Sequence, residues 1–168
     1  MALSASETGH LVLGTMNTPN AAKTIDRLID LFPPADQQQV RVTLAGGLRL
    51  IVSQRLLPAQ QGPRRVAAVE LLPGSIALWN LIRDGKTYQI PSLQQRGKGL
   101  GIIRQIDSLA ELVRGGKTTP AAALAAAEAP DELRSMLQEA STARAAPVAQ
   151  AGGRGLLDKA GALFKKGS

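Results

Sequence analysis

The small number of β-strand patterns limits the folds open to this chain more than any other feature. Residues 50–57 (LIVSQRLL) and 65–72 (RVAAVELL) are typical of strands, and the loop-forming segment PAQQGP lies between them. Residues 10–17 contain a continuous apolar run, which predicts a third strand, covered on both faces. Two or three strands are too few for a doubly wound sheet. We therefore expect the rear part of a larger α/β core.

Helical patterns accompany and follow these strands. Apolar residues at helical spacing predict helices over residues 18–32, 36–48 and 75–84. Thr18 is expected to cap the first of them, with Pro at its first position. Residues 86–140 are expected to be mostly helical, so strands come first and helices dominate the rest.

Composition limits the kinds of core, site and partner that this chain can have. The chain has 168 residues, 44% of them hydrophobic and only 2% aromatic, so its core must consist mainly of Leu, Ile, Val and Ala. The absence of Cys excludes disulfides, thiolate metal sites and a Cys nucleophile. The net charge of +7 is compatible with nucleic acid, membrane headgroups or nucleotide phosphates. Few aromatics and no recognised motif disfavour nucleic acid. We expect no transmembrane helix and no signal peptide.

One long segment has a familiar pattern. Residues 7–33, ETGHLVLGTMNTPNAAKTIDRLIDLFP, resemble the His-box region of the secretion ATPase superfamily, and within it the PilT-like retraction (twitching motility) ATPases of type IV pili. The likeness continues through residues 52–58, 65–75 and 77–86, and more weakly through 99–117. A match this long, in order and in spacing, is far more specific than a single TGHL.

This resemblance implies a fold. The chain is expected to be α/β, the C-terminal portion of a RecA-like P-loop ATPase core, followed by an all-helical region. Residues 1–72 would supply the core part with its His box, and residues 73–140 the helical region. Residues 141–168, rich in Ala, Gly and basic residues, are expected to form a flexible linker and a basic tail.

The resemblance also implies catalytic positions. His10 would open a core strand and Asn17 would end it near the γ-phosphate, where the imidazole can donate a hydrogen bond or orient catalytic groups. Asn17 stands where the family has a second His, and an amide cannot carry a proton charge. The alternative for His10 is a histidine at the end of a strand, with backbone groups as its only partners.

A second motif lies in the helix predicted from Ser75. Residues 77–84 (ALWNLIRD) resemble the family pattern Ala-Ile-Arg-Asn-Leu-Ile-Arg-Glu, with Trp79 in place of an Arg. The resemblance implies that this motif supports pilus retraction. The alternative is an ordinary capped amphipathic helix, with an apolar side expected from Ile76, Trp79 and Ile82 or their neighbours. The residues of the motif that match the family are Asn80, Leu81, Ile82 and Arg83.

The sequence lacks the elements that hold nucleotide in this family. No Walker A segment occurs, and the glycine-rich residues 96–101 (RGKGLG) have the wrong spacing and predict a turn. No acidic residue ends an apolar strand before His10, so there is no Walker B motif. The complete family protein uses ATP and Mg²⁺. This chain alone is expected to bind neither tightly, and whether it is an enzyme stays open.

Two functions follow as expectations. In the first, the chain is the C-terminal fragment of a hexameric pilus retraction motor, cytoplasmic and peripheral at the inner membrane, with a membrane platform protein as partner. In the second, it is a catalytically inactive module that docks on pilus or type II secretion ATPases. Residues 154–166 combine apolar and basic residues at helical spacing, which indicates either a membrane-surface helix or a frayed tail.

Overall fold

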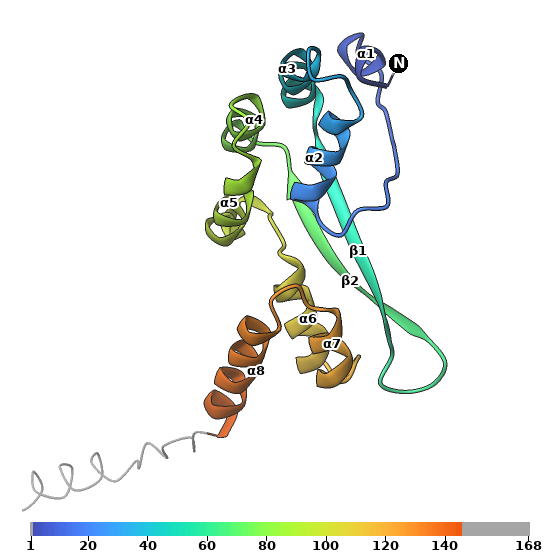
Figure 1. Ribbon diagram of the computed structural model, residues 1–168. Coiled ribbons are helices and arrows are strands. Elements are labelled where there is room, and N and C mark those ends of the chain that lie inside the picture. Colours follow the sequence, from blue (N-terminus) through green and yellow to red (C-terminus); the bar gives the residue numbers. More distant parts are fainter. Residues whose placement is uncertain (1, 146–168) are drawn as a thin grey trace, which may run out of the picture. The chain divides into compact units, whose positions relative to one another are not determined.

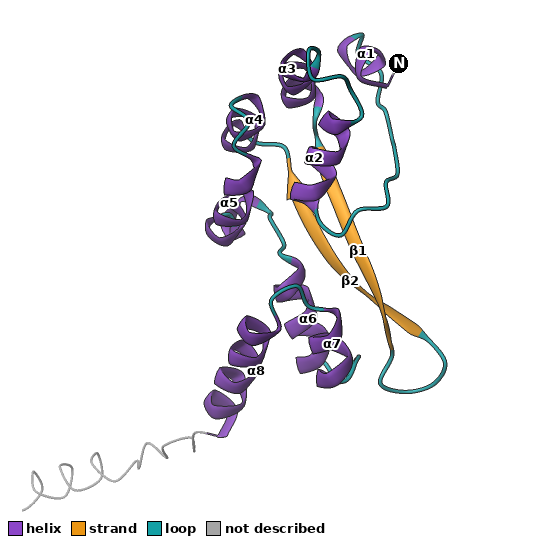
Figure 2. Ribbon diagram, viewed as in Figure 1, coloured by secondary structure: helices purple, strands orange, loops and turns teal. Residues whose placement is uncertain are grey.

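Helices dominate the computed structural model, which describes residues 2–145 (Figures 1 and 2). The elements in chain order are α1 (Ala2–Glu7), α2 (Ala21–Asp30), α3 (Gln37–Gly47), β1 (Leu50–Pro58), β2 (Arg65–Pro73), α4 (Ile76–Arg83), η1 (Thr87–Gln89), α5 (Ile90–Arg96), η2 (Lys98–Leu100), α6 (Gln105–Arg114), α7 (Pro120–Ala126) and α8 (Pro130–Ala145). One compact unit ends at Leu137, and a second begins at Gln138.

Both strands of the described sheet belong to one antiparallel hairpin. Leu50 pairs with Pro73 and Pro58 pairs with Arg65, so all nine residues of each strand are in register. Side chains alternate between the faces, because successive residues of a strand point to opposite sides. Most positions of one face, among them Ile51 and Leu72, are buried, whereas the opposite face is exposed along β1 and partly buried at residues 69–73 of β2.

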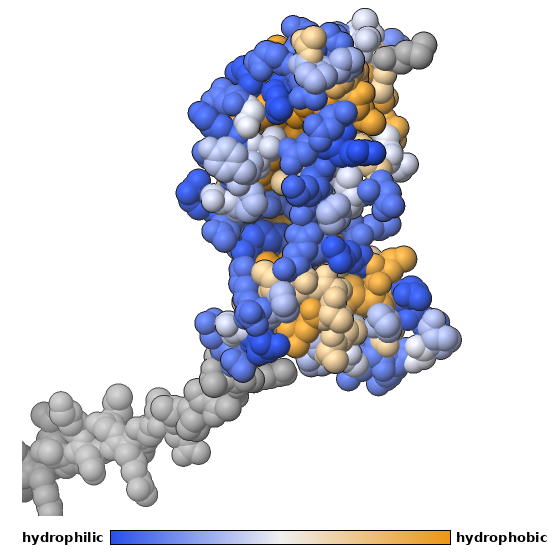
Figure 3. Space-filling model, in the orientation of Figure 1, coloured by the Kyte–Doolittle hydropathy of each residue, from blue (hydrophilic) through white to orange (hydrophobic). Residues whose placement is uncertain are grey.

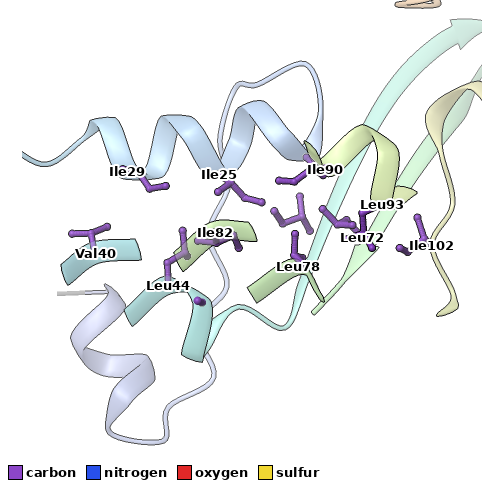
Figure 4. Packing of buried hydrophobic residues seen from close by; sticks show 13 residues of the cluster. Ile25, Ile29, Val40, Leu44, Leu72, Leu78, Ile82, Ile90, Leu93 and Ile102 are labelled. Carbon is purple, nitrogen blue, oxygen red and sulfur yellow. The ribbon is translucent and has the colours of Figure 1, made fainter. Parts of the chain in front are cut away.

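The first hydrophobic cluster lies at the end of the hairpin where β1 begins. Figure 4 shows side chains from α2, α3, α4, α5 and β2 directed into one interior. The buried members are Ala21, Ile25, Ile29, Val40, Leu44, Ala45, Ile51, Leu72, Leu78, Ile82, Ile90, Leu93 and Ile102. Leu, Ile, Val and Ala build this cluster, as the composition requires.

The second cluster lies toward the hairpin's turn. Leu57 and Ala68 of the hairpin pack there with Leu109 of α6, Ala123 of α7 and Leu133 of α8. Partly buried hydrophobic side chains surround this cluster, and hydrophobic residues are visible at the surface where α6 and α7 lie (Figure 3). One hairpin therefore contributes to both clusters.

The structure confirms the two predicted strands at 50–57 and 65–72, and it corrects the third. Residues 10–17 form no strand, and Leu11 and Leu13 are 80% and 88% exposed rather than covered. A strand requires a neighbour for its backbone N–H and C=O groups. The part of the chain that the structure describes offers none to this segment, so it runs between α1 and α2 without a ladder.

The start of α2 is also different from the prediction. Asn20, rather than Thr18, is the N-cap, and its Oδ1 accepts a hydrogen bond from the Lys23 backbone at 2.8 Å. The Thr18 hydroxyl instead bonds the Thr24 hydroxyl at 2.6 Å. Both residue types cap helices well, and Asn20 has the extended backbone that a cap requires.

Helix α4 begins and ends as predicted, and its buried face differs from the prediction at Ile76. Ser75 caps it by accepting a hydrogen bond from the Leu78 backbone at 3.3 Å, and Gly85 follows with a φ of +69°. Leu78 and Ile82 are buried, whereas Ile76 is 72% exposed. The apolar side expected from Ile76, Trp79 and Ile82 or their neighbours is confirmed at Ile82 and at Leu78, the neighbour of Trp79. It does not include Ile76, because Leu78 and Ile82 are four apart and define the inward face.

The predicted turn at residues 96–101 is confirmed, since a short 3₁₀ helix ends there at Gly101 with a φ of +76°. The helical character of residues 86–140 is confirmed as well. Residues 141–145 continue α8 instead of starting a linker, and the rest of the expected linker and basic tail lies outside the described residues. No helix within residues 2–145 is long and apolar enough to span a membrane.

Candidate functional site

His10 lies directly after α1, in an exposed position. Its backbone N–H donates to the Ala5 carbonyl at 3.1 Å, and its Nδ1 is 3.0 Å from the Thr8 hydroxyl. Asn17 is exposed too, and no hydrogen bond in the described part of the chain joins it to His10. Since Thr8 holds one ring nitrogen, the imidazole presents Nε2 to its surroundings.

The segment that carries these two residues leads into a firmly held helix start. Asn20 caps α2 with its Oδ1, and its Nδ2 donates to both carboxylate oxygens of Glu128 at 2.9 and 3.1 Å. Arg55 of β1 lies 3.6 Å from the same carboxylate. The first residues of α2 are thereby connected to the hairpin and to the segment before α8.

Glu70 of β2 also holds the start of α2. Its carboxylate is 4% exposed, and its Oε2 accepts the backbone N–H of Ala21 at 2.9 Å. Its Oε1 accepts from the Gln94 side chain of α5 at 2.6 Å. A carboxylate at the N-terminus of a helix is favoured by the helix dipole and by the free N–H groups there. Glu70 therefore joins β2, α2 and α5.

An open hollow of about 430 Å³ lies along α2 from Lys23 to Asp30. Its charged lining residues are Lys23, Asp26, Arg27, Asp30 and Arg41. Lys23 and Asp26 form an exposed ion pair at 3.8 Å, whereas neither arginine takes part in an ion pair within residues 2–137. The hollow follows directly on the segment of His10 and Asn17, and its guanidinium groups favour anions.

The second predicted motif is divided between two faces of α4. Ile82 is fully buried and Leu81 packs against the first cluster, whereas Asn80 and Arg83 are exposed. Arg83 Nη1 donates to Asn80 Oδ1 at 3.2 Å, so the two polar residues form one outward-facing pair. Trp79 is half-buried and donates through Nε1 to the Leu48 carbonyl at 3.2 Å. This indole therefore ties α4 to the end of α3.

Sequence reasoning missed Glu70, although the signal was present. In RVAAVELL the inward positions are those of Ala68 and Leu72, and the alternation puts Glu70 between them on the same face. A charge at a predicted core position calls for a partner. The identity of that partner, a helix N-terminus from residue 21, was not readable from the sequence.

The fold and these residues belong to a known class of protein. Residues 1–91 match the family described as "Type II/IV secretion system protein", and the chain belongs to that family. The predicted fold class, part of a RecA-like ATPase core followed by helices, is confirmed.

The particular relatives are pilus proteins. The chain is 46% identical over 123 residues to a twitching motility protein of Neisseria gonorrhoeae, an alignment that covers 73% of this chain and 33% of the relative. It is 47% identical over 102 residues to the type IV pilus retraction ATPase PilT of Pseudomonas aeruginosa, covering 61% and 29%. Its structure resembles a crystal structure of the retraction motor PilT with bound ADP, with a TM-score of 0.71 at 43% identity, over 80% of this chain and 37% of the other. The chain thus spans about a third of the length of these relatives.

The described residues contain no group of three or more His, Cys, Asp or Glu side chains that could hold a metal ion. They also carry no phosphate-binding loop, because the sequence has no Walker A segment. The candidate site therefore consists of the His10–Asn17 segment, the hollow beside α2 and the outward pair on α4. The roles of His10, Asn17 and the α4 motif stay predictions.

Proposed function

We propose that this chain supplies the C-terminal part of an ATP-driven motor that retracts type IV pili. One observation carries the proposal: identity of 46–47% to a twitching motility protein and to a pilus retraction ATPase, over most of the chain. The His-box segment and the α4 motif both lie within residues 1–91, which match the family. The outward pair of Asn80 and Arg83 supports it further, because an exposed polar pair is available to a partner rather than to the core.

We further propose that the chain does not hydrolyse ATP by itself. Phosphoryl transfer in this class depends on backbone N–H groups and a Lys that cradle the phosphates, and on Mg²⁺ held by a Ser or Thr and an acidic residue. This sequence offers His10 and neighbouring cations but no such loop. ATP and Mg²⁺ would therefore act at a site completed by other polypeptide.

The exposed face of the hairpin also supports the proposal that further polypeptide packs against this chain. Leu50, Val52 and Leu56 point outward from β1 and are each more than half exposed. A row of apolar side chains on one sheet face is a surface that packing normally covers. In a motor the covering material would be the remainder of the core. Assembly as a hexamer, in the cytoplasm beside an inner-membrane platform protein, belongs to the same proposal.

A chimeric motor tests the proposal directly. The segment of the Pseudomonas aeruginosa retraction ATPase that aligns with this chain would be replaced by this chain's residues, and twitching would be measured in a strain that lacks the native motor. We expect retraction to be restored. A chimera that hydrolyses ATP and assembles normally yet supports no twitching would contradict a retraction function.

The isolated chain tests the nucleotide part. We expect calorimetry to detect no tight ATP binding and a coupled assay to detect no turnover with Mg²⁺. Magnesium-dependent turnover clearly above that of a His10→Ala control would contradict this expectation. A catalytically inactive docking module would instead fail in the chimera but bind the intact motor.

A further inference from the structure

A cavity of about 170 Å³ with several polar lining residues lies between the start of α2, α5, the start of α6 and the segment before α8. The side chains that matter for its chemistry are Glu70, Gln94, Arg104, Gln105 and Glu132. None of them belongs to the His-box segment or to the α4 motif. The volume is enough for a planar group with several polar atoms.

Gln105 lines this cavity and carries an unused hydrogen-bond donor that is enclosed behind the cavity wall. The side chain is 9% exposed and lines the cavity, and its Nε2 is the one buried side-chain nitrogen or oxygen without a hydrogen-bond partner in the described part of the chain. A buried amide without a partner costs about 1–3 kcal/mol. Rotation of the side-chain amide would bring this donor to the cavity, where an acceptor group on a ligand would satisfy it.

Glu70 adds an uncompensated negative charge. Both of its hydrogen bonds come from uncharged donors, the Ala21 backbone and the Gln94 amide, and it takes part in no ion pair within the described residues. Buried carboxylates are normally paired with a cation. Each carboxylate oxygen can accept a second hydrogen bond, so Glu70 retains acceptor capacity on both oxygens.

Arg104, the cationic residue that lines this cavity, already has carboxylate partners. Arg104 donates through Nε and Nη2 to Asp107 and through Nη1 to Glu132, each at 2.9 Å. The hydrogen bond to Asp107 raises the pKa of Arg104, with Glu132 adding to the effect and burial opposing it. Arg104 therefore stays charged, and its guanidinium is occupied by carboxylates other than Glu70.

We propose that this cavity binds the guanidinium group of an arginine presented by a protein partner. Glu70 accepts hydrogen bonds from the guanidinium, and the Gln105 amide rotates so that its enclosed Nε2 donates to a carbonyl oxygen of the same peptide segment. A carboxylate and a guanidinium match each other in a planar, two-point arrangement, and guanidinium tolerates burial better than ammonium. A metal ion does not fit, since the described residues form no ligand group for one. The inference does not rest on retraction activity.

The first test uses the full 168-residue chain and a small probe. Acetyl-arginine-methylamide would be titrated into ¹⁵N-labelled protein while the side-chain amide signals of Gln94 and Gln105 are followed. Acetyl-citrulline-methylamide is the matched control, because it has the same shape without the charge. We expect saturable shifts with the arginine probe and binding at least about tenfold weaker with citrulline, since a charge-assisted hydrogen bond is worth more than a neutral one. Equal binding of the two probes, or no saturable shift at these amides, would overturn the inference.

Matched variants provide the second test. Glu70→Gln removes the charge and keeps the shape, and Glu111→Gln makes the same change on an exposed part of α6 outside the cavity. We expect the first to weaken the arginine probe about tenfold and the second to leave it unchanged. If Glu70→Gln does not fold, Gln105→Met removes the donor instead and is expected to weaken binding severalfold. Wild-type affinity in a folded Glu70→Gln, or in the Gln105→Met that replaces it, would overturn the proposal.

Discussion

Glu70 shows how one side chain can organise three elements of this molecule. It lies on the inward face of β2, accepts the first N–H of α2 and binds the side chain of Gln94 on α5. Ser53 is opposite it on β1. If such a buried carboxylate is removed, its hydrogen-bond donors are left without a partner. The resulting loss of stability is larger than the net contribution of the hydrogen bonds themselves.

Glu70→Ala is therefore expected to lower the free energy of unfolding by about 2–4 kcal/mol, because one buried and one partly buried donor lose their acceptor. Urea denaturation followed by circular dichroism would measure the change. Glu111→Ala, at an exposed position of α6, is the control and should change stability by less than about 0.5 kcal/mol. Similar effects of the two substitutions would mean that Glu70 does not hold the start of α2.

His10 is expected to matter for activity and not for stability. The side chain is exposed and touches only Thr8 through its ring, so His10→Ala should leave the urea midpoint of this chain nearly unchanged. In a complete chimeric motor the same substitution should lower ATP turnover at least about tenfold, as for loss of a group that orients or stabilises charge in the transition state. Wild-type turnover in that motor would contradict a catalytic role for His10.

At the scale of elements, α4 has two faces with different tasks. Leu78 and Ile82 anchor it in the first cluster, and the Trp79 indole fixes it to the Leu48 carbonyl. Gly74 must be small there, since a Cβ atom would lie 2.5 Å from that same carbonyl oxygen. The exposed side chains of Asn80 and Arg83, by contrast, form a hydrogen bond with each other and with no other side chain of the described residues. One set of residues therefore anchors the helix, and another set is exposed and available to a partner.

The two faces of α4 should therefore respond differently to substitution. Asn80→Ala with Arg83→Ala should change stability by less than about 0.5 kcal/mol, whereas Ile82→Ala should cost about 3 kcal/mol because it leaves a cavity in the core. In the chimeric motor, the double variant should impair twitching while ATP affinity stays nearly unchanged. Loss of ATP binding as severe as the loss of retraction would mean that the outward pair supports the fold instead.

Sequence patterns predicted most elements because local chemistry decides them. The cap at Ser75, the stop at Gly85 and the hairpin around PAQQGP all follow from short-range turn and capping preferences. The strand predicted at residues 10–17 failed for the opposite reason, since pairing depends on a neighbour far away in sequence. Glu70 and Gln105 were missed likewise, because their surroundings come from helices distant along the chain.

At the scale of the whole molecule, the hairpin has one packed face and, along β1, one bare face. The inward residues serve both hydrophobic clusters, and the outward row of Leu50, Val52 and Leu56 contacts neither. Resemblance to a family predicted the α/β class and the position of the chain within it, whereas composition and periodicity alone indicated only a partial core. The exposed row is what that partial core leaves uncovered.

The purified chain is accordingly expected to self-associate. Light scattering after gel filtration should show species larger than a monomer, and Val52→Lys with Leu56→Lys should shift them toward monomer by placing charges on the bare face. Leu100→Lys, at an equally exposed apolar position in η2, is the control and should have no such effect. A monodisperse wild-type monomer with a sharp cooperative melt would argue for a self-sufficient domain.

The hairpin's participation in both clusters has a mechanical consequence. Each strand has nine residues and is therefore about 30 Å long. A backbone ladder of this length resists bending, so a rotation of about 5° where α2 and α4 pack would displace the turn end by about 3 Å. Spin labels on α3 and α7 would report such a displacement as a change in distance. The hairpin would then act as a lever. A small rotation near the start of α2 would move the turn end, where α6 and α7 pack, by nearly the length of a hydrogen bond.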